Sequence, residues 1–182
     1  GYPVMIKAAA GGGGRGISIV HEENDLIPKM RLTQQEALNS FGSDEIYLEK
    51  FLDSPRHIEV QVLADNFGNA LHFYERDCSI QRKNQKIVEE APALNIPEEK
   101  KQELFKLCTE CCKKMKYKGA GTFEFLYKDE EFYFIEMNTR LQVEHTVSEM
   151  ITDYDLVKLQ IGIAAGEELD CLLYTSPSPR DQ

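Results

Sequence analysis

The sequence contains no apolar run that approaches the roughly 18 residues needed to span a bilayer, and it is poor in positive charge. Its 182 residues include 21 Lys and Arg against 31 Asp and Glu, which gives a formal net charge of −10 at pH 7. Nucleic acids and anionic membrane surfaces select for basic patches, so this balance argues against both. We therefore expect neither nucleic acid nor membrane among the partners.

Cysteine is also scarce. The five cysteines are Cys78, Cys108, Cys111, Cys112 and Cys171. An odd number without a secretory signal pattern argues against a disulfide framework. Cys108 and Cys111 form a C-x-x-C pair, which leaves metal or redox chemistry open, but no second pair or nearby histidine completes a zinc set. We expect reduced cysteines in a cytoplasmic protein.

The remaining composition is that of an ordinary globular protein. Hydrophobic residues make up 42% of the chain and charged residues 29%, which suffices for a real core. The length suits one domain or two small ones. Because the chain opens on Gly1 rather than Met, we expect a fragment. Residues 171–182 are rich in Ser and Pro without periodicity, as in a linker or a non-native tail.

Local patterns predict a mixture of helices and strands. We expect strands over 3–8, 17–20, 45–52, 56–65 and 70–80, helices over 22–41, 97–117 and 148–167, and a β-hairpin over 119–140. Pro28 should interrupt the first helix, and 81–86 should form a polar, basic loop. Alternation places Ile58, Val60 and Val62 on one face of their strand, and His57, Glu59 and Gln61 on the other.

The glycine run of residues 11–14 raises the question of phosphate binding. Gly11, Gly13 and Gly16 match G-x-G-x-x-G, but a dinucleotide-binding site needs a helix directly afterwards, and a P-loop needs Gly-Lys-Ser/Thr. Here Ile17 begins a β-branched run. A glycine loop between two strands can still align N–H groups along phosphates. A mobile surface loop remains the alternative.

The predicted hairpin carries acids. If its turn is centred on 129–131, Glu124 and Glu136 fall opposite one another and Asn138 shares the face of Glu136. Facing carboxylates repel, and a divalent cation between them removes the repulsion. Two carboxylates and an amide oxygen suit Mg²⁺ or Mn²⁺, whereas a solvated polar face is the alternative. The opposite face is expected to hold Phe123, Phe125, Tyr133 and Ile135.

The segment after the hairpin concentrates polar groups. Arg140, Gln142 and Glu144 lie within a few residues, as in a site for a small oxyanion and a general base. His145 next to them is more typical of a structural hydrogen bond. Lys83 and Lys86 would add positive charge if their loop folds back over the hairpin.

Six segments together resemble biotin carboxylase, an ATP-grasp enzyme. They are IKAAAGGGGRG, EKFLDSPRHIEVQVLAD, ERDCSIQRKNQK, EEAPA, GAGTFEFL and FIEMNTRLQVEH. The resemblance covers residues 1–170 and extends to the equivalent parts of acetyl-CoA, pyruvate and propionyl-CoA carboxylases. It implies an α+β chain with the ATP-grasp fold: a glycine-rich lid over 1–51 and a larger antiparallel sheet with flanking helices over 52–170.

The resemblance also implies roles for individual residues. The nucleotide-binding positions are Lys7, Gly12, Gly13, Gly14, Glu49, Lys50, Leu52, His57, Gln81 and Leu126. Glu124, Glu136 and Asn138 match the metal ligands. Lys86, Arg140, Gln142 and Val143 match the bicarbonate pocket, and Glu144 matches the general base.

The implied reaction consumes ATP and bicarbonate, uses a pair of Mg²⁺ or Mn²⁺ ions, and carboxylates biotin by way of carboxyphosphate. The implied partners are a biotin carboxyl carrier protein and a carboxyltransferase, in a homodimeric parent that serves, for example, fatty acid biosynthesis. Asn84 stands where many relatives carry histidine. Parts of the family enzyme on both sides are missing, so we expect little or no activity from the chain alone.

Two alternatives stay open. A carbamoyl phosphate synthetase is another ATP-grasp enzyme that makes carboxyphosphate, although the segment RLQVEH favours the biotin enzyme. A non-catalytic nucleotide-binding module would have lost the metal or base positions, yet Glu124, Glu136, Asn138 and Glu144 are all present.

Overall fold

The structure is a computed structural model that describes residues 1–11, 15–82 and 84–169. The chain forms two compact units. The N-terminal unit comprises Gly1–Ser54 together with Gln81–Gln85, and the sheet unit comprises Pro55–Ile80 and the chain from Lys86 onward. The subdomain boundaries that the resemblance implies stay a prediction.

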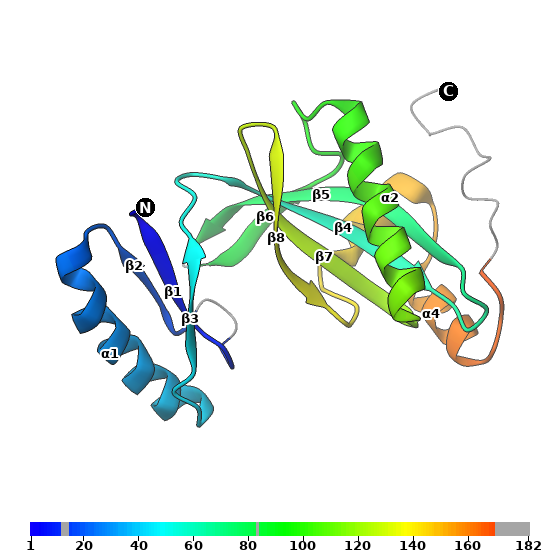
Figure 1. Cartoon of the computed structure of the whole chain (residues 1–182). Coiled ribbons are helices and arrows are strands. Elements are labelled where there is room, and N and C mark those ends of the chain that lie inside the picture. Colours follow the sequence, from blue (N-terminus) through cyan, green and yellow to red (C-terminus); the bar gives the residue numbers. More distant parts are fainter. Residues whose placement is uncertain (12–14, 83, 170–182) are drawn as a thin grey trace. The chain divides into compact units, whose positions relative to one another are not determined.

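The N-terminal unit is a three-stranded antiparallel sheet with one helix (Figure 1). Its elements are β1 (Val4–Ala8), β2 (Ile17–Val20), α1 (Glu23–Phe41) and β3 (Ile46–Lys50), and the strand order is β2-β1-β3. Ile6, Val20 and Ala37 are fully buried in its core. Thr33 Oγ1 donates to Ser18 Oγ over 2.8 Å and so ties α1 to β2.

Pro28 lies inside α1 without interrupting it, so that prediction was wrong. The proline stands near the N-terminal end, where it removes one backbone hydrogen bond. The helical turns that follow carry the buried residues Thr33 and Ala37. Their packing against the sheet supplies the stability that the local sequence lacks.

The connection from β1 to β2 is closed by backbone bonds. Ala8 N donates to Gly16 O over 2.9 Å, and Gly11 N donates to Ala8 O over 3.0 Å. Gly16 has a φ of +68°, and a Cβ there would lie 2.8 Å from the Ala8 Cβ. Both facts require glycine at this position. Gly12, Gly13 and Gly14, predicted to cover phosphates, lie outside the described residues.

The sheet unit is built on a five-stranded sheet of order β6-β5-β4-β7-β8. The strands are β4 (Arg56–Ala64), β5 (Ala70–Arg82), β6 (Gln85–Glu90), β7 (Gly119–Lys128) and β8 (Glu131–Asn138). The loop predicted over 81–86 was wrong in extent, because β5 continues to Arg82 and β6 begins at Gln85. Asn84, with a φ of +61°, allows a tight turn.

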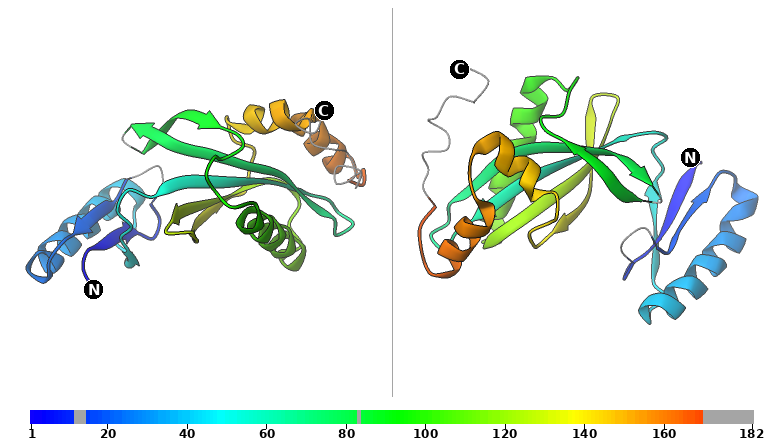
Figure 2. Two further views of the ribbon diagram at one scale, coloured as in Figure 1. Left: turned by 90° about the horizontal axis from the view of Figure 1, so that it is seen from above. Right: turned by 180° about the vertical axis from the view of Figure 1, so that it is seen from behind.

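Helices cover both faces of this sheet (Figure 2). Helix α2 (Glu98–Met115) packs on one face, and α4 (Leu156–Ala164) packs on the other, preceded by α3 (His145–Thr152). The α2 side buries Val60, Val62, Leu104, Phe105, Cys108, Phe123 and Phe125. The α4 side buries Leu63, Leu71, Phe73, Ala120, Leu156 and Ile163. The predicted alternation of β4 is therefore confirmed.

The single helix predicted over 148–167 was wrong, because α3 and α4 are separate helices. Asp153 adopts a left-handed conformation with a φ of +59° and ends α3. The Asp155 carboxylate then accepts from Lys158 N over 2.8 Å and caps the start of α4. None of the helices in the described residues is long and apolar enough to cross a membrane.

A bulge in β5 brings a charged side chain to the α3 face. The register of β4 and β5 shifts between Val60 and Val62, and Tyr74 opposite this stretch has a φ of +60°. Beyond the shift, Arg76 pairs with Glu59. The extra residue reverses the side-chain alternation of the strand, so Arg76 lies on the same face as Glu59.

Candidate functional site

A cluster of polar side chains lies on the sheet face that α3 covers. Its buried members from the strands are Glu59, Gln61, Arg76, Thr122 and Glu124. The register pairs Glu59 with both Glu124 and Arg76, and Gln61 with Thr122. Because paired residues of neighbouring strands share a face, these groups form one continuous polar layer within an otherwise apolar unit.

Glu124 is the centre of this cluster. Its Oε1 accepts hydrogen bonds from Asn138 Nδ2 over 2.8 Å, from Gln142 Nε2 over 2.9 Å and from Lys86 Nζ over 3.0 Å. His57 Nε2 lies 3.1 Å from its Oε2. The structure thus brings together five residues that the sequence analysis selected: His57, Lys86, Glu124, Asn138 and Gln142.

Lys86 connects three carboxylates. Its Nζ lies 2.7 Å from Glu144 Oε1 and 3.0 Å from Glu124 Oε1, and it also contacts Glu59. Arg76 Nη2 supplies a further positive charge 3.0 Å from Glu59 Oε2. Opposite charges therefore alternate through the cluster, which offsets part of the cost of burying them.

These contacts determine the protonation of the acids. Burial by itself would raise the pKa of Glu124, but hydrogen bonding from His57 and the charge of Lys86 outweigh it and lower the pKa to about 2. Burial likewise works to raise the pKa of Glu144, and hydrogen bonding from Lys86 reverses the effect, so its pKa is lowered. Both groups are carboxylates at neutral pH.

The hairpin register confirms that Glu124 and Glu136 lie opposite one another. The turn is one residue shorter than predicted: Lys128 pairs with Glu131, and both residues between them have a positive φ. A register shift next to Glu124 restores the expected pairing further along the hairpin. Two deviations from the predicted hairpin thus cancel at the acid pair.

The same register corrects the prediction for Tyr133. Tyr133 pairs with Leu126, two residues from Glu124 along β7, so it lies on the Glu124 face rather than opposite. The bulge reverses the alternation of β8 between Phe134 and Glu136. Phe125 accordingly pairs with Phe134 instead of Ile135, and Phe123 and Phe125 are buried on the α2 side as predicted.

The residues present fit a divalent cation. Glu124, Glu136 and Asn138 offer hard oxygen donors from one face of the hairpin, which suits Mg²⁺ or Mn²⁺. Glu136 is exposed and opposes the buried Glu124. His57, Glu59 and Glu124 form a second possible group, with ligand atoms within 4.8 Å of one another. Glu124 belongs to both groups, so a cation there competes with the Lys86 ammonium.

The segment after β8 is divided between the cluster and the surface. Gln142 and Glu144 are buried, with exposed fractions of 7% and 9%, whereas 89% of Val143 is exposed. Arg140 is also exposed, and its Nη1 donates to Leu141 O over 3.3 Å. The structure therefore brings Gln142 and Glu144 to the cluster, and it places Arg140 and Val143 at the surface beside them.

Four predicted nucleotide-binding residues belong to the N-terminal unit. Lys7 of β1 forms an ion pair with Glu49 of β3, with Nζ 2.8 Å from Oε2. Lys50 ends β3, and Leu52 is buried two residues later. Two further predicted residues lie on strands: Gln81 in β5, and Leu126 in β7 where it pairs with His57.

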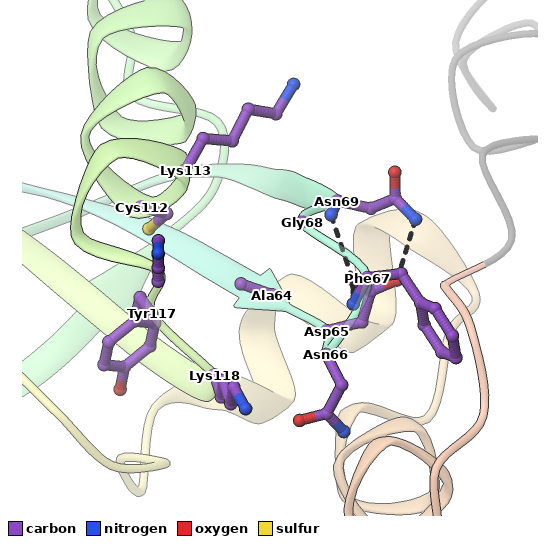
Figure 3. A pocket seen from close by; sticks show the side chains of 11 residues that line it. Ala64, Asp65, Asn66, Phe67, Gly68, Asn69, Cys112, Lys113, Tyr117 and Lys118 are labelled. Atoms are coloured by element: carbon purple, nitrogen blue, oxygen red, sulfur yellow. Dashed lines mark hydrogen bonds between the residues drawn. The ribbon is translucent and has the colours of Figure 1, made fainter.

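A cavity of about 400 Å³ lies elsewhere in the sheet unit, between the β4–β5 turn and the C-terminal end of α2 (Figure 3). It is lined by none of the predicted site residues. The Asp65 carboxylate in its wall accepts from the backbone of Phe67, Asn69 and Leu169 over 2.8–3.0 Å. That carboxylate holds the turn in place, so the cavity is not the candidate site.

The sequence analysis assigned no role to Glu59, Gln61, Arg76, Thr122 or Ser148, all of which are buried in the cluster. Glu59 and Gln61 were placed on the polar face of β4, and this alternation was the available signal. Arg76 lies in a strand whose alternation is broken by the bulge at Tyr74. Single-sequence periodicity does not reveal such a bulge.

Comparison with known proteins shows what the chain is similar to. Residues 1–172 match the family described as "Carbamoyl-phosphate synthase L chain, ATP binding domain". The chain is 59% identical over 169 residues to a biotin carboxylase of Pseudomonas aeruginosa, covering 93% of this chain and 38% of that protein. It is 48% identical over 169 residues to a pyruvate carboxylase of Staphylococcus aureus, covering 93% of this chain and 15% of that protein.

Two solved structures share the fold. A Campylobacter jejuni biotin carboxylase in complex with β,γ-ATP has a TM-score of 0.91 at 51% identity, covering 93% of this chain and 38% of that one. The biotin carboxylase domain of Hydrogenobacter thermophilus 2-oxoglutarate carboxylase, bound to MgADP, ADP and bicarbonate, has a TM-score of 0.89 at 52% identity with the same coverage. The chain thus spans well under half the length of each of these relatives.

Proposed function

Since the chain belongs to the family of the carbamoyl-phosphate synthase L chain ATP-binding domain, we propose that it is the ATP-grasp part of a biotin carboxylase. The full-length protein that carries it would use ATP and bicarbonate to carboxylate biotin. The observation that carries this proposal is the buried cluster in which Lys86 joins Glu124 and Glu144 beside Gln142. A paired lysine, amide and carboxylate suit a small oxyanion and its deprotonation.

The proposed reaction begins with bicarbonate. Glu144 removes its proton, and the resulting oxygen nucleophile attacks the γ-phosphorus of ATP, which releases ADP and forms carboxyphosphate. Carboxyphosphate breaks down to CO₂ and phosphate. The phosphate accepts the proton from the biotin ureido nitrogen, and that nitrogen forms a bond to CO₂. Most of the acceleration in such a reaction comes from holding the reactants in place.

Glu124, Glu136 and Asn138 would hold the Mg²⁺ or Mn²⁺ ions. When bound, these ions neutralise negative charge on the β- and γ-phosphates. Lys86 has a separate role, because its ammonium is positioned by Glu59, Glu124 and Glu144 without any ion.

Lys86 also controls the strength of Glu144 as a base. A carboxylate with a lowered pKa is a weak proton acceptor, and Lys86 contributes to lowering the pKa of Glu144. Bicarbonate bound to Lys86 would take over part of this interaction, and the pKa of Glu144 would rise as its ammonium partner turns to the substrate. Arg140, Gln142 and Val143 complete the proposed bicarbonate pocket.

The proposed nucleotide contacts are Lys7, Gly12, Gly13, Gly14, Glu49, Lys50, Leu52, His57, Gln81 and Leu126. Lys7 carries the positive charge that a phosphate needs, and Glu49 holds it 2.8 Å away in the described structure. The partners that we propose are a biotin carboxyl carrier protein, a carboxyltransferase and a second copy of the full-length protein. We place the protein in the cytoplasm, and the thiol state of Cys78, Cys108, Cys111 and Cys112 supports this.

ATP hydrolysis by the full-length protein tests the proposal against its alternative. We expect hydrolysis to require bicarbonate and to increase on addition of free biotin. Stimulation by ammonia or glutamine instead would favour a carbamoyl phosphate synthetase. Nucleotide binding without bicarbonate-dependent hydrolysis would contradict the proposal and favour a non-catalytic module.

A further inference from the structure

Arg76 is the only arginine of the described residues with no exposed surface, and it joins several elements. Its Nη1 donates to Gln61 Oε1 and to Ser148 Oγ, both over 2.9 Å. Its Nη2 donates to Glu59 Oε2 over 3.0 Å. Longer bonds of 3.5 Å run from Nη2 to Thr122 Oγ1 and Gln142 Oε1. One guanidinium therefore contacts β4, β7, the segment after β8, and α3.

The bond to Ser148 fixes α3 on the sheet. Helix α3 begins at His145, and Glu144 is its N-cap residue. Glu144 and Ser148 are four residues apart, a spacing that places them on the same side of the helix about one turn apart. Ser148 is fully buried. Its contact with Arg76 thus determines where the N-terminal end of α3 lies, and with it Glu144.

A second chain of contacts leads from Arg76 to Lys86. Glu59 Oε2 accepts from Arg76, while Oε1 of the same carboxylate contacts Lys86. Gln142 forms a parallel link, because its Oε1 accepts from Arg76 and its Nε2 donates to Glu124 over 2.9 Å. Arg76 therefore holds both members of the Lys86–Glu144 pair, one through Ser148 and the other through Glu59.

We propose that Arg76 is a positioning residue, which through Ser148 and Glu59 sets the geometry between the Glu144 carboxylate and the Lys86 ammonium. The proposal rests on the proposed function, in which these two groups handle bicarbonate. A buried ionic cluster is seldom the most stable filling for a protein interior, and apolar residues of similar volume often serve stability equally well. Its planar fork of donors makes arginine suited to orienting several acceptors at once.

The test uses three substitutions in the full-length protein. Ser148→Ala removes only the link to α3. Arg76→Lys keeps the charge but loses the planar fork. Lys101→Met is the matched control, because it breaks the buried ion pair between Lys101 Nζ and Glu75 Oε1, 2.8 Å apart, on the α2 side of the same sheet.

Steady-state kinetics is the first measurement. We expect kcat of bicarbonate-dependent ATP hydrolysis to fall about tenfold in Ser148→Ala and about a hundredfold in Arg76→Lys, since misplaced catalytic groups cost such factors. The KM for ATP should stay within about twofold in both. Lys101→Met should lower the melting temperature but keep kcat. Variants at Arg76 and Ser148 that lose stability and retain kcat, as the control does, would overturn the proposal.

Hydrogen exchange is the second measurement, and it does not depend on activity. Backbone amides of α3 should exchange faster in Ser148→Ala and Arg76→Lys, while those of α2 keep the wild-type rate. Unchanged exchange in α3 would overturn the positioning role. If the wild-type protein lacks bicarbonate-dependent hydrolysis, the proposed function fails, and the exchange data still decide whether Arg76 holds α3.

Discussion

At the scale of single residues, the site depends on one carboxylate with an unusual number of partners. Glu124 accepts from Lys86, Asn138 and Gln142 at one oxygen and lies beside His57 at the other. The sequence predicted Glu124 as a metal ligand from its place opposite Glu136. It could not predict the contacts with Lys86 and Gln142, because these come from segments far apart in the chain.

Glu124 should make the stability of the chain sensitive to acid. Its pKa is lowered from 4.5 to about 2 in the folded chain, so its contribution is complete above the unfolded pKa and is lost as the pH falls through the folded one. We expect the difference in free energy of unfolding between wild type and Glu124→Gln to change over this interval. Urea titrations followed by circular dichroism measure it.

The expected size is on the order of 1–3 kcal/mol between pH 7 and pH 2, with wild type losing more than the variant. Glu131→Gln is the control, because Glu131 is an exposed acid of the same hairpin. It should follow the wild-type pH dependence. A Glu124→Gln variant whose stability falls with pH in parallel with wild type would contradict the assignment.

At the scale of elements, irregularities of the strands decide which side chains reach the site. The hairpin of β7 and β8 combines a shorter turn with a bulge, and the two cancel at Glu124 and Glu136. The bulge at Tyr74 turns Arg76 to the α3 face. Alternation predicted β4 and the aromatic side of β7 correctly, since those strands are regular. It failed for Tyr133 and gave no indication of Arg76, since a bulge reverses the parity.

The connection between β1 and β2 gives a prediction at this scale. Gly16→Ala should destabilise the N-terminal unit by about 2–3 kcal/mol, because it combines a strained backbone with a steric clash. The added Cβ would lie 2.8 Å from the Ala8 Cβ, at a φ of +68°. Thermal unfolding of this variant, its control and wild type measures the effect.

Gly42→Ala is the matched control. Gly42 ends α1 in the same unit with a φ of +76°, but a Cβ there meets no atom within 4 Å. It should therefore cost about 1 kcal/mol from backbone strain alone. Equal losses for the two variants would show that the contact with Ala8 is unimportant.

At the scale of the whole molecule, the predicted α+β chain with the ATP-grasp fold is confirmed by the family match and the solved relatives. The resemblance rested on segments that include most of the buried cluster, so the fold and the central acids were predictable together. The division of the last helical stretch into α3 and α4 was not, because it depends on Asp153 and Asp155 at their ends. That division gives Glu144 its place at the start of a short helix.

Transfer of labelled carbon from bicarbonate to biotin, measured in the full-length protein with wild-type Glu144 and with Glu144→Gln, tests the central claim most directly. The account predicts ATP-dependent carboxybiotin formation by wild type and a loss of at least about a hundredfold in the variant, with ATP affinity unchanged within about twofold. The substituted amide would keep the size of the side chain and a hydrogen bond with Lys86 but could not accept the proton. Carboxybiotin formation that survives in Glu144→Gln at the wild-type rate would contradict the account.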